Sequence, residues 1–461
     1  MLGFSRRELL LGSTGCVAAF AAGGIAASRA EATTHQLTLA NLDHRILPDA
    51  ITRNMMSFAE GAPPPVLRFK QGEKVIVDVR NKLDEATVVH WHGLRIANAM
   101  DGVPYLTQYP IEPGQSFRYA FTPPDAGTFW YHPHCNTLEQ IARGLTGVLV
   151  VEEADDPGFD HDVPLNLRDF RLGGDGQFIS FYKPRNAARG GTLGTVSTVN
   201  WEVEPTYAFE AGSLVRLRLA VTDLTRVGRY EIAGADAQVI AIDSNPLPAP
   251  MPAHDVILSP GQRADIALRM PDEEGRAAEL ALQRKIGSKV LARFLAKGAS
   301  LGRDLAELKP LPQNPVPQAD LKNAEVIEFV FGWSPEGDAP QSNICGSLGY
   351  TFWSINRTAW PGDLPGPFDP LATLKLGKSY ILRLRNETPN AHPIHLHGVS
   401  FQLLRSNKRE IPKLVTDTAL LLSEETMDLA LVADNPGDWA FHCHVIEHQK
   451  TGLAGFLRIE D

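Results

Sequence analysis

The sequence predicts an all-β protein built from three consecutive β-sandwich domains. Its 461 residues are too many for one hydrophobic core, and about 150 residues per domain makes three domains the default. The 39 glycines and 34 prolines favour many short strands over long helices. A hydrophobic content of 43% is high enough to bury a large core, which excludes a mainly disordered chain.

Residues 1–30 are interpreted as an export signal. Arg6 and Arg7 precede a mildly apolar run that ends in small residues at 28–32, the pattern of a cleaved signal peptide. The adjacent arginines resemble the bacterial twin-arginine type, which makes the twin-arginine export machinery an expected partner. Two alternatives are an uncleaved membrane anchor and a lipoprotein attached through Cys16. The run is barely long enough and too rich in Gly and Ala for a span, and Ser13 stands where a lipoprotein signal wants leucine.

The rest of the chain has no stretch apolar enough to span a bilayer. We therefore expect a soluble, periplasmic mature protein without a membrane span, and a monomer. The net charge is −10, and the chain has no long basic run, so a nucleic acid is not an expected partner.

Short segments of alternating apolar residues mark the expected strands. They include Val66–Phe69, Lys74–Val79, Leu214–Leu219 and Tyr380–Arg385. Period-two alternation bounded by turn residues predicts half-buried strands in antiparallel sheets.

Three of these strands also form a weak internal repeat. Gly72, Gly212 and Gly377 each precede an alternating strand, and the strands end near Asn81, Asp223 and Asn386. The spacing, about 140 to 165 residues, indicates three copies of one sandwich. Linkers rich in proline, glycine or acidic residues place the domains at 31–155, 156–310 and 311–461.

Ten of the 14 histidines fall in four tight clusters. These are His90-Trp91-His92, His132-Pro133-His134, His392-Pro393-Ile394-His395-Leu396-His397 and His442-Cys443-His444 with His448. In extended backbone a His-X-His pair places both imidazoles on one face. Four such pairs supply eight imidazoles, enough for a polynuclear metal centre. The scattered His35, His44, His161 and His254 are expected to be structural or surface residues.

The fourth cluster predicts two different metal sites on one strand. Because side chains alternate, Cys443 points away from His442 and His444. His392 and His448 remain unpaired and complete a set of two histidines and a cysteine around Cys443. This set is typical of a blue-copper electron-transfer site. Zinc is a poor explanation, because it has no redox role and does not need two metal sites joined through adjacent residues of one strand.

These clusters, in this order and at both ends of the mature chain, resemble those of the multicopper oxidase family of laccase-like enzymes. The resemblance implies three cupredoxin-like Greek-key β-sandwiches and four copper ions. It assigns His392, Cys443 and His448 to type 1 copper, and His90 and His395 to type 2 copper. His92, His132 and His444 resemble one set of type 3 ligands, and His134, His397 and His442 the other.

The implied reaction removes single electrons from a small reducing substrate, expected to be a phenol or aromatic amine, beside His448. Four electrons pass through Cys443 and reduce dioxygen to water. One alternative is a periplasmic oxidase of cuprous ions in copper tolerance, which the seven scattered methionines do not favour. Another is a cell-envelope copper-binding or structural protein with little turnover, which the complete ligand set disfavours.

Four further residues refine this expectation. Leu453 occupies the axial position of the type 1 site and cannot coordinate, which predicts a high potential. Asp101 matches an acid that supplies protons near type 2 copper. Gln449 stands where a second acid is common, and the nearby Glu447 is expected to face elsewhere.

Two cysteines have no assigned copper role. Cys135 and Cys345 form a disulfide if export places them in an oxidising compartment, or remain two buried thiols. The sequence leaves both possibilities open.

Overall fold

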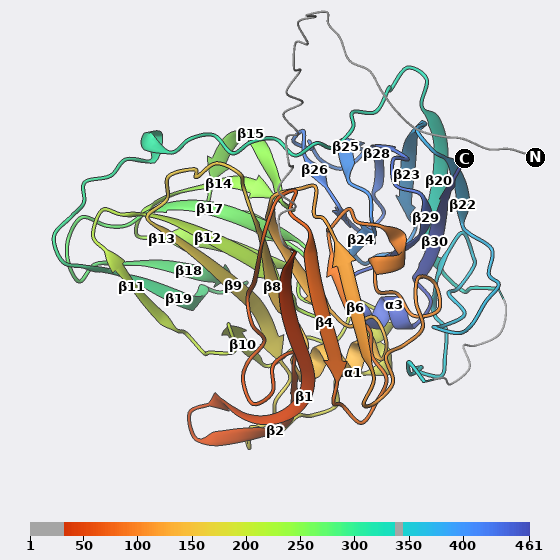
Figure 1. Cartoon of the computed structure of the whole chain (residues 1–461), viewed down its shortest axis with the longest axis horizontal. Helices are drawn as coiled ribbons and strands as arrows, with labels where there is room; N and C mark the ends of the chain where they lie inside the picture. The colour runs from red at the N-terminus through yellow and green to blue at the C-terminus, as the bar shows by residue number, and fades with distance from the viewer. Residues whose placement is uncertain (1–31, 337–343) are drawn as a thin grey trace, which may run out of the picture. The chain divides into compact units, whose positions relative to one another are not determined.

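The computed structural model describes residues 32–336 and 344–461, so the predicted export signal and Cys16 lie outside the described residues. Residues 32–461 form one compact unit. Its strands form six sheets, paired along the chain into three β-sandwiches (Figure 1). Each sandwich encloses its own apolar core. In the described part of the chain, no helix has the length and apolar character needed to cross a membrane.

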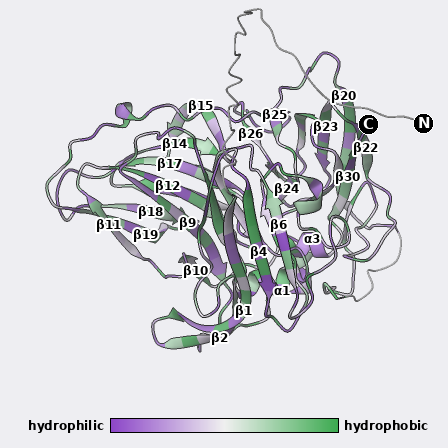
Figure 2. Cartoon of the chain, viewed as in Figure 1, coloured by the Kyte–Doolittle hydropathy of each residue, from purple (hydrophilic) through white to green (hydrophobic). Residues whose placement is uncertain are grey.

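The first sandwich pairs a sheet in the order β2-β1-β4-β6 with one in the order β3-β8-β7-β5. Its strands are β1 (Thr33–Leu47), β2 (Ala50–Ser57), β3 (Leu67–Lys70), β4 (Val75–Asn81), β5 (His90–His92), β6 (Ser116–Phe121), β7 (Gly127–His132) and β8 (Gly147–Glu152). Figure 2 shows hydrophobic and hydrophilic residues alternating along β1 and β4, as expected when one face of a strand packs on the core.

The second sandwich pairs the order β10-β9-β12-β17-β14-β15 with β11-β19-β18-β13-β16. Its strands are β9 (His161–Phe170), β10 (Val196–Val199), β11 (Thr206–Glu210), β12 (Leu214–Val221), β13 (Gly228–Ala233), β14 (Asp236–Ile242), β15 (Asn245–Pro252), β16 (Val256–Leu258), β17 (Arg263–Arg269), β18 (Ala277–Gln283) and β19 (Ser288–Lys297).

The third sandwich pairs β21-β20-β23-β28-β25-β26 with β22-β30-β29-β24-β27. Its strands are β20 (Glu325–Trp333), β21 (Trp353–Ile355), β22 (Ala372–Lys375), β23 (Ser379–Asn386), β24 (His392–Leu396), β25 (Phe401–Ser406), β26 (Val415–Thr416), β27 (Thr418–Leu421), β28 (Thr426–Val432), β29 (Gly437–Cys443) and β30 (Ala454–Glu460). The domain boundaries predicted near residues 155 and 310 lie in the β8–β9 and β19–β20 connections and stay predictions.

Short helical segments lie between the strands. The α-helices are α1 (Thr137–Arg143), α2 (Pro184–Ala187) and α3 (Ile446–Lys450), and 3₁₀ turns span Asn98–Met100 and Leu305–Glu307. Both α1 and α3 follow directly after histidine clusters.

The internal repeat is confirmed at its three glycine turns and at two of its three strand ends. Gly72, Gly212 and Gly377 have φ values of +76°, +63° and +77° before β4, β12 and β23, a backbone conformation that favours glycine. At the ends of β4 and β23, the side chains of Asn81 and Asn386 each donate to two backbone carbonyls and accept one backbone N–H.

Two expectations about the strands are wrong in part. The sheets are mixed rather than antiparallel, because each contains one parallel pair, such as β4 with β1, β12 with β9, and β23 with β20. A long connection that passes through the other sheet allows such pairing, whereas a tight hairpin does not. In addition, β12 is buried along its whole length, because Arg216 and Arg218 pair with Asp265 instead of facing water.

Candidate metal centre

The three donor atoms of the predicted type 1 set converge inside the third sandwich. His392 begins β24, Cys443 ends β29 and His448 lies on α3. The two Nδ1 atoms are 3.0 Å apart, and Cys443 Sγ lies 3.7 Å from His392 Nδ1 and 3.5 Å from His448 Nδ1. All three side chains are buried, and their donor atoms are close enough to hold one metal ion.

Hydrogen bonds at the far nitrogen orient both of these imidazoles. His392 Nε2 is hydrogen-bonded to Thr388 Oγ1 at 2.8 Å, and His448 Nε2 donates to the backbone carbonyl of Arg189 at 2.6 Å. Each bond leaves the Nδ1 lone pair directed at the cysteine. Arg189 follows α2 in the second sandwich, and the sequence contains no pattern that would have predicted this contact.

The surroundings of this set are apolar. Trp353 packs its ring at 5.0 Å from that of His392 and 4.8 Å from that of His448. Leu453 is fully buried in the same core, and its carbonyl accepts the backbone N–H of Cys443. Burial raises the pKa of the Cys443 thiol and lowers that of His448 to about 3, so the imidazole is neutral.

The other eight clustered histidines meet where the first and third sandwiches face each other. In the first, His90 on β5 pairs with His132 on β7; in the third, His395 on β24 pairs with His442 on β29. All eight side chains are buried: His90, His92, His132, His134, His395, His397, His442 and His444.

Rings from the two sandwiches are in contact. The centroid of His90 lies 3.8 Å from that of His397, and the centroid of His92 lies 3.8 Å from that of His395. His134 and His442 are 5.2 Å apart. Cys443 and its neighbour His442 therefore serve opposite sides of β29, as the alternation predicts.

The structure brings the predicted ligand sets together to different degrees. Donor atoms of His134, His397 and His442 form one compact group, and His90 and His395 share a group with His397. His92 and His132 share a group with His90. His444 lies with its ring centroid 5.0 Å from His92 and 5.5 Å from His132.

The ring tautomers suit metal binding. Nδ1 of His90, His132, His395 and His442 each donates to a backbone carbonyl, which leaves the Nε2 lone pairs free. Among the described residues, Nε2 of His90, His132, His395 and His444 is buried without a hydrogen-bond partner. Because buried polar atoms without partners are costly, and imidazole is a good copper ligand, these residues fit a copper cluster.

Burial also keeps these imidazoles uncharged. Desolvation, reinforced by neighbouring histidines, lowers the pKa of His132, His134 and His397 well below the ordinary value. The pKa of His442 falls to about 3. Neutral imidazole is the form that binds a metal ion.

The predicted acid and one unpredicted acid lie beside the cluster. Asp101 is fully buried; its Oδ2 accepts from His397 Nδ1 at 2.9 Å, and its Oδ1 has no hydrogen-bond partner. The missed acid is Asp417, whose backbone carbonyl accepts from His395 Nδ1 at 2.8 Å. Its carboxylate Oδ1 lies 3.4 Å from Nε2 of His92. Its only sequence signal is its position between two threonines.

The residues near α3 are arranged largely as expected. Glu447 faces away from the cluster, and its Oε2 accepts the backbone N–H of Thr192. Gln449, at the position where an acid is common, places its Nε2 3.2 Å from His134 Nε2.

The open question about the remaining cysteines is settled. Cys135 and Cys345 form a disulfide, with Cα atoms 4.5 Å apart and 210 residues between them in sequence. It ties the segment after His134 in the first sandwich to a segment of the third.

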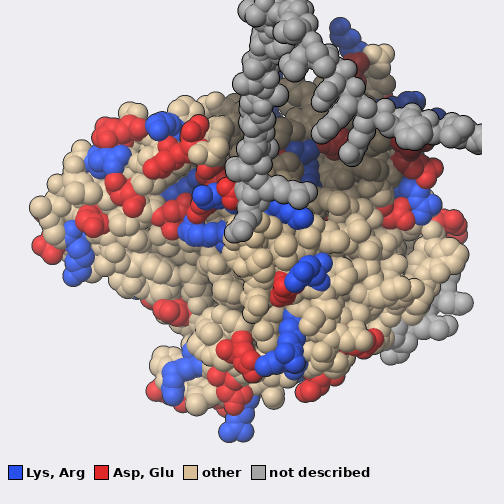
Figure 3. All heavy atoms as spheres, in the orientation of Figure 1, with Lys and Arg blue, Asp and Glu red and all other residues tan. Residues whose placement is uncertain are grey.

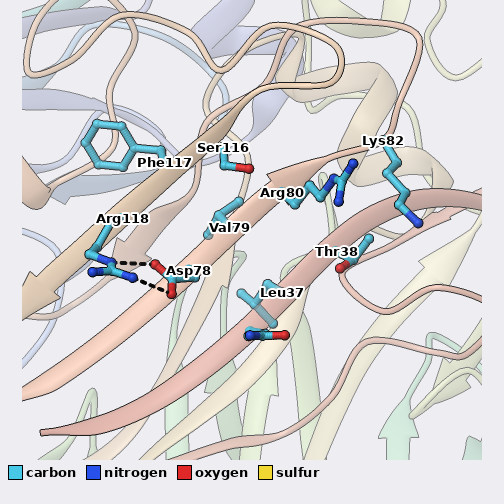
Figure 4. Close-up of a pocket in the computed structure, with 10 residues that line it drawn as sticks. Leu37, Thr38, Asp78, Val79, Arg80, Lys82, Ser116, Phe117 and Arg118 are labelled. Carbon is cyan, nitrogen blue, oxygen red and sulfur yellow. Dashed lines mark hydrogen bonds and ion pairs between the residues drawn. The ribbon is translucent and has the colours of Figure 1, made fainter.

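The four isolated histidines take no part in either group. His35 packs on Phe69, His44 on Trp201, and His161 bonds to Glu210. The groove in Figure 4 also lies apart from the predicted site. It is formed by β1, β4 and β6 and lined by Arg80, Lys82 and Arg118 among others, with Arg118 paired to Asp78. On the face shown in Figure 3, acidic and basic side chains are interspersed.

Comparisons with known proteins agree with this geometry. Two multicopper oxidase family models match residues 42–156 and 346–461. The crystal structure of a multi-copper oxidase from Pseudomonas thermotolerans is 40% identical, with a TM-score of 0.83 over 93% of this chain and 100% of that one. Multicopper oxidase MmcO of Mycobacterium tuberculosis is 28% identical over 87% of this chain and 82% of its own. Laccase-1 of Botryotinia fuckeliana is 27% identical over 88% and 78%. The chain belongs to the multicopper oxidase family, whose members are copper-dependent oxidoreductases that use dioxygen.

Proposed function

We propose that this oxidase is laccase-like and binds four copper ions, one of type 1, one of type 2 and two of type 3. The observation that carries the proposal is the strand end His442-Cys443-His444. Cys443 belongs to the His392–His448 group, and its two neighbours belong to the eight-histidine cluster. Copper, when bound, accepts single electrons from a reductant and delivers them to dioxygen. The peptide between these residues provides a short covalent route from one site to the other.

The remaining ligands follow the two groups of side chains. We assign type 1 copper to His392, Cys443 and His448, and type 2 copper to His90 and His395. One type 3 ion takes His92, His132 and His444, and the other takes His134, His397 and His442. The buried imidazole nitrogens without partners support this assignment.

Asp101 is proposed as the proton donor of the cluster. Reduction of dioxygen to water consumes protons, and a positioned carboxyl group is an effective source. Its Oδ2 holds His397, whereas its buried Oδ1 accepts no hydrogen bond, lies 3.3 Å from His90 Nδ1, and is the atom that would carry the proton. Gln449 cannot release a proton, and both carboxylate oxygens of Asp417 accept from Arg263, which leaves Asp101 as the acid on which delivery depends.

A cavity beside α3 favours an aromatic reductant. It has a volume of about 520 Å³, and its lining combines the aromatic Phe178, Phe181 and Tyr182 with the charged Glu139, Arg143 and Lys450. Among the described residues, its lining contains no methionine, the side chain whose soft sulfur suits cuprous ions. We therefore place phenols or aromatic amines ahead of Cu(I) as substrates.

The test is oxygen uptake by the copper-loaded protein with four reductants in parallel: a phenol, an aromatic amine, Cu(I) and Fe(II). The proposal predicts uptake with the phenol or the amine. Faster uptake with Cu(I) or Fe(II) would instead favour a metal oxidase. Absence of uptake with all four would favour a copper-binding protein with little turnover.

We also propose that the protein is exported to the periplasm. The mature protein is proposed to be a monomer. Arg6 and Arg7 support a twin-arginine signal, and the Cys135–Cys345 disulfide suits an oxidising compartment. Replacing both arginines with lysine is expected to retain the protein in the cytoplasm on fractionation. Light scattering of the mature protein checks the monomer.

A further inference from the structure

The second sandwich contains none of the ten clustered histidines, yet one of its loops forms a wall of the eight-histidine cluster. This loop, residues 259–262, connects β16 to β17. A Cβ added to Gly261 would lie 3.0 Å from His444 Cδ2 and 3.1 Å from His92 Cε1. The carbonyl of Gly261 also accepts from Trp130 Nε1 at 3.3 Å. The loop backbone is therefore packed directly on two predicted copper ligands.

Arg263, the first residue of β17, forms a bidentate salt bridge with Asp417 through its guanidinium. Nη1 donates to Oδ1 at 2.8 Å and Nη2 to Oδ2 at 2.7 Å. Such a fork-to-fork pair fixes the orientation of both groups. Arg263 is fully buried, and its Nε donates to the carbonyl of Thr128 in the first sandwich. One side chain of the second sandwich thus touches both of the others.

Gly93, the residue that follows the His90-Trp91-His92 cluster, leaves space for the Arg263–Asp417 pair. A Cβ on Gly93, directly after His92, would lie 2.5 Å from Arg263 Nη2 and 2.7 Å from Asp417 Oδ2. With φ at +87°, Gly93 also adopts a conformation that other residues rarely accept.

Asp417 in turn holds two predicted ligands. Its carbonyl accepts Nδ1–H of His395, which leaves His395 Nε2 directed elsewhere and without a partner. Its Oδ1 lies 3.4 Å from both His92 Nε2 and His395 Nδ1.

From these contacts we infer that Arg263 is a positioning residue for type 2 copper: by clamping Asp417, it fixes the ring of His395 and the direction of its Nε2. The inference rests on the proposed function, because it takes His395 as a type 2 ligand. It gives the second sandwich a role at the cluster although that sandwich supplies no predicted ligand.

The test compares Arg263→Gln with Arg269→Gln, which changes the other end of the same strand, β17. Arg269 bonds to Asp272 and the Arg303 carbonyl, away from the clustered histidines. Copper is counted per chain, and the type 2 signal is recorded by electron paramagnetic resonance together with the blue type 1 absorption. Arg263→Gln is expected to alter the type 2 signal or lose one copper per chain while the blue absorption stays. Arg269→Gln is expected to match the wild type.

Arg263→Lys separates geometry from charge, because lysine keeps the charge but not the two-pronged contact. It is expected to restore the copper count but not the wild-type shape of the type 2 signal, and it decides the question if Arg263→Gln fails to fold. A folded variant of either kind with an unchanged type 2 signal and copper count overturns the inference. A wild-type protein without any type 2 signal contradicts the proposed function instead.

Discussion

The predicted type 1 histidines and the predicted type 2 histidines are held in opposite ways. In the group around Cys443, His392 and His448 are tied at Nε2 and present Nδ1. In the eight-histidine cluster, His90 and His395 are tied at Nδ1 and present Nε2. Which nitrogen remains free is set by the acceptor behind the ring.

The groups also differ in their surroundings. Trp353 and Leu453 enclose the first in apolar side chains, whereas the carboxyl groups of Asp101 and Asp417 flank the second. An apolar pocket suits a site that only exchanges electrons. Carboxyl groups suit a site where dioxygen takes up protons as well as electrons. The two regions thus suit the roles proposed for them, electron uptake at the first and reduction of dioxygen at the second.

The largest effect is expected from Cys443→Ser, which breaks the link between the groups. Serine is a poor ligand for the type 1 ion, because blue-copper sites depend on a thiolate. The blue absorption and turnover should both be abolished, while the cluster keeps its three copper ions. Absorption spectra, copper counts and oxygen uptake measure these quantities. Retained blue colour would mean that Cys443 is not the type 1 ligand.

Asp101→Asn tests whether Asp101 delivers protons to the eight-histidine cluster without affecting the group around Cys443. Asparagine can still accept from His397 but cannot release a proton, so turnover should fall by ~10²-fold. Reduction of type 1 copper by substrate, followed by stopped flow without oxygen, should be unchanged. Asp78→Asn, on the outer sheet of the first sandwich, serves as the control. Equal losses in both steps would show a general structural defect.

Acid should destabilise the metal-free protein through both regions. The pKa of His448 in one group and of His442 in the other is about 3 when folded, against 6.5 unfolded. Between these values the unfolded chain binds protons that the folded chain does not, so stability is present above pH 6.5 and lost toward pH 3.

His448 and His442 together give the free energy of unfolding a slope of up to about 3 kcal/mol per pH unit in that window. Denaturant unfolding at several pH values measures it, with the copper-loaded protein as the comparison. Copper competes with protons for the same nitrogens, so loading should move the loss to lower pH. Metal-free stability that stays constant from pH 6.5 to 5 would be incompatible with these buried, neutral histidines.

The smallest effect is expected from Leu453→Met, which changes only the apolar group. A thioether in the axial position should lower the type 1 potential by on the order of 60 mV, a tenfold change in a one-electron equilibrium. Leu457→Met, a buried position in the same core, is the matched control. Redox titration that finds the same potential in both variants would remove Leu453 from the axial position.

The sequence predicted how each histidine cluster is arranged because its members are neighbours along the chain. Which distant clusters meet, such as those of His134 and His442, 308 residues apart, followed from the family resemblance. His-X-His spacing in a strand determines which face each side chain takes, and this was sufficient to separate Cys443 from His442 and His444. The predicted sandwiches rested in the same way on local alternation and on turns such as those at Gly72 and Gly377.

Contacts between distant segments were beyond such patterns. Arg263 and Asp417 are 154 residues apart and Arg189 and His448 are 259 apart, and neither pair is part of a repeated motif. The prediction that β12 is half-buried was wrong for a related reason, because its arginines alternate with apolar residues. A charged side chain on a strand usually faces water, but Arg216 finds its acidic partner Asp265 in the interior.

In the proposed reaction, electrons enter at the Cys443 group and are collected at the eight-histidine cluster until dioxygen is fully reduced. The most direct measurement is the number of one-electron reductant molecules oxidised per dioxygen consumed by the copper-loaded protein, with peroxide assayed in parallel. Full reduction of dioxygen to water consumes four molecules of reductant per dioxygen and leaves no peroxide. A ratio of two with accumulating peroxide would contradict it.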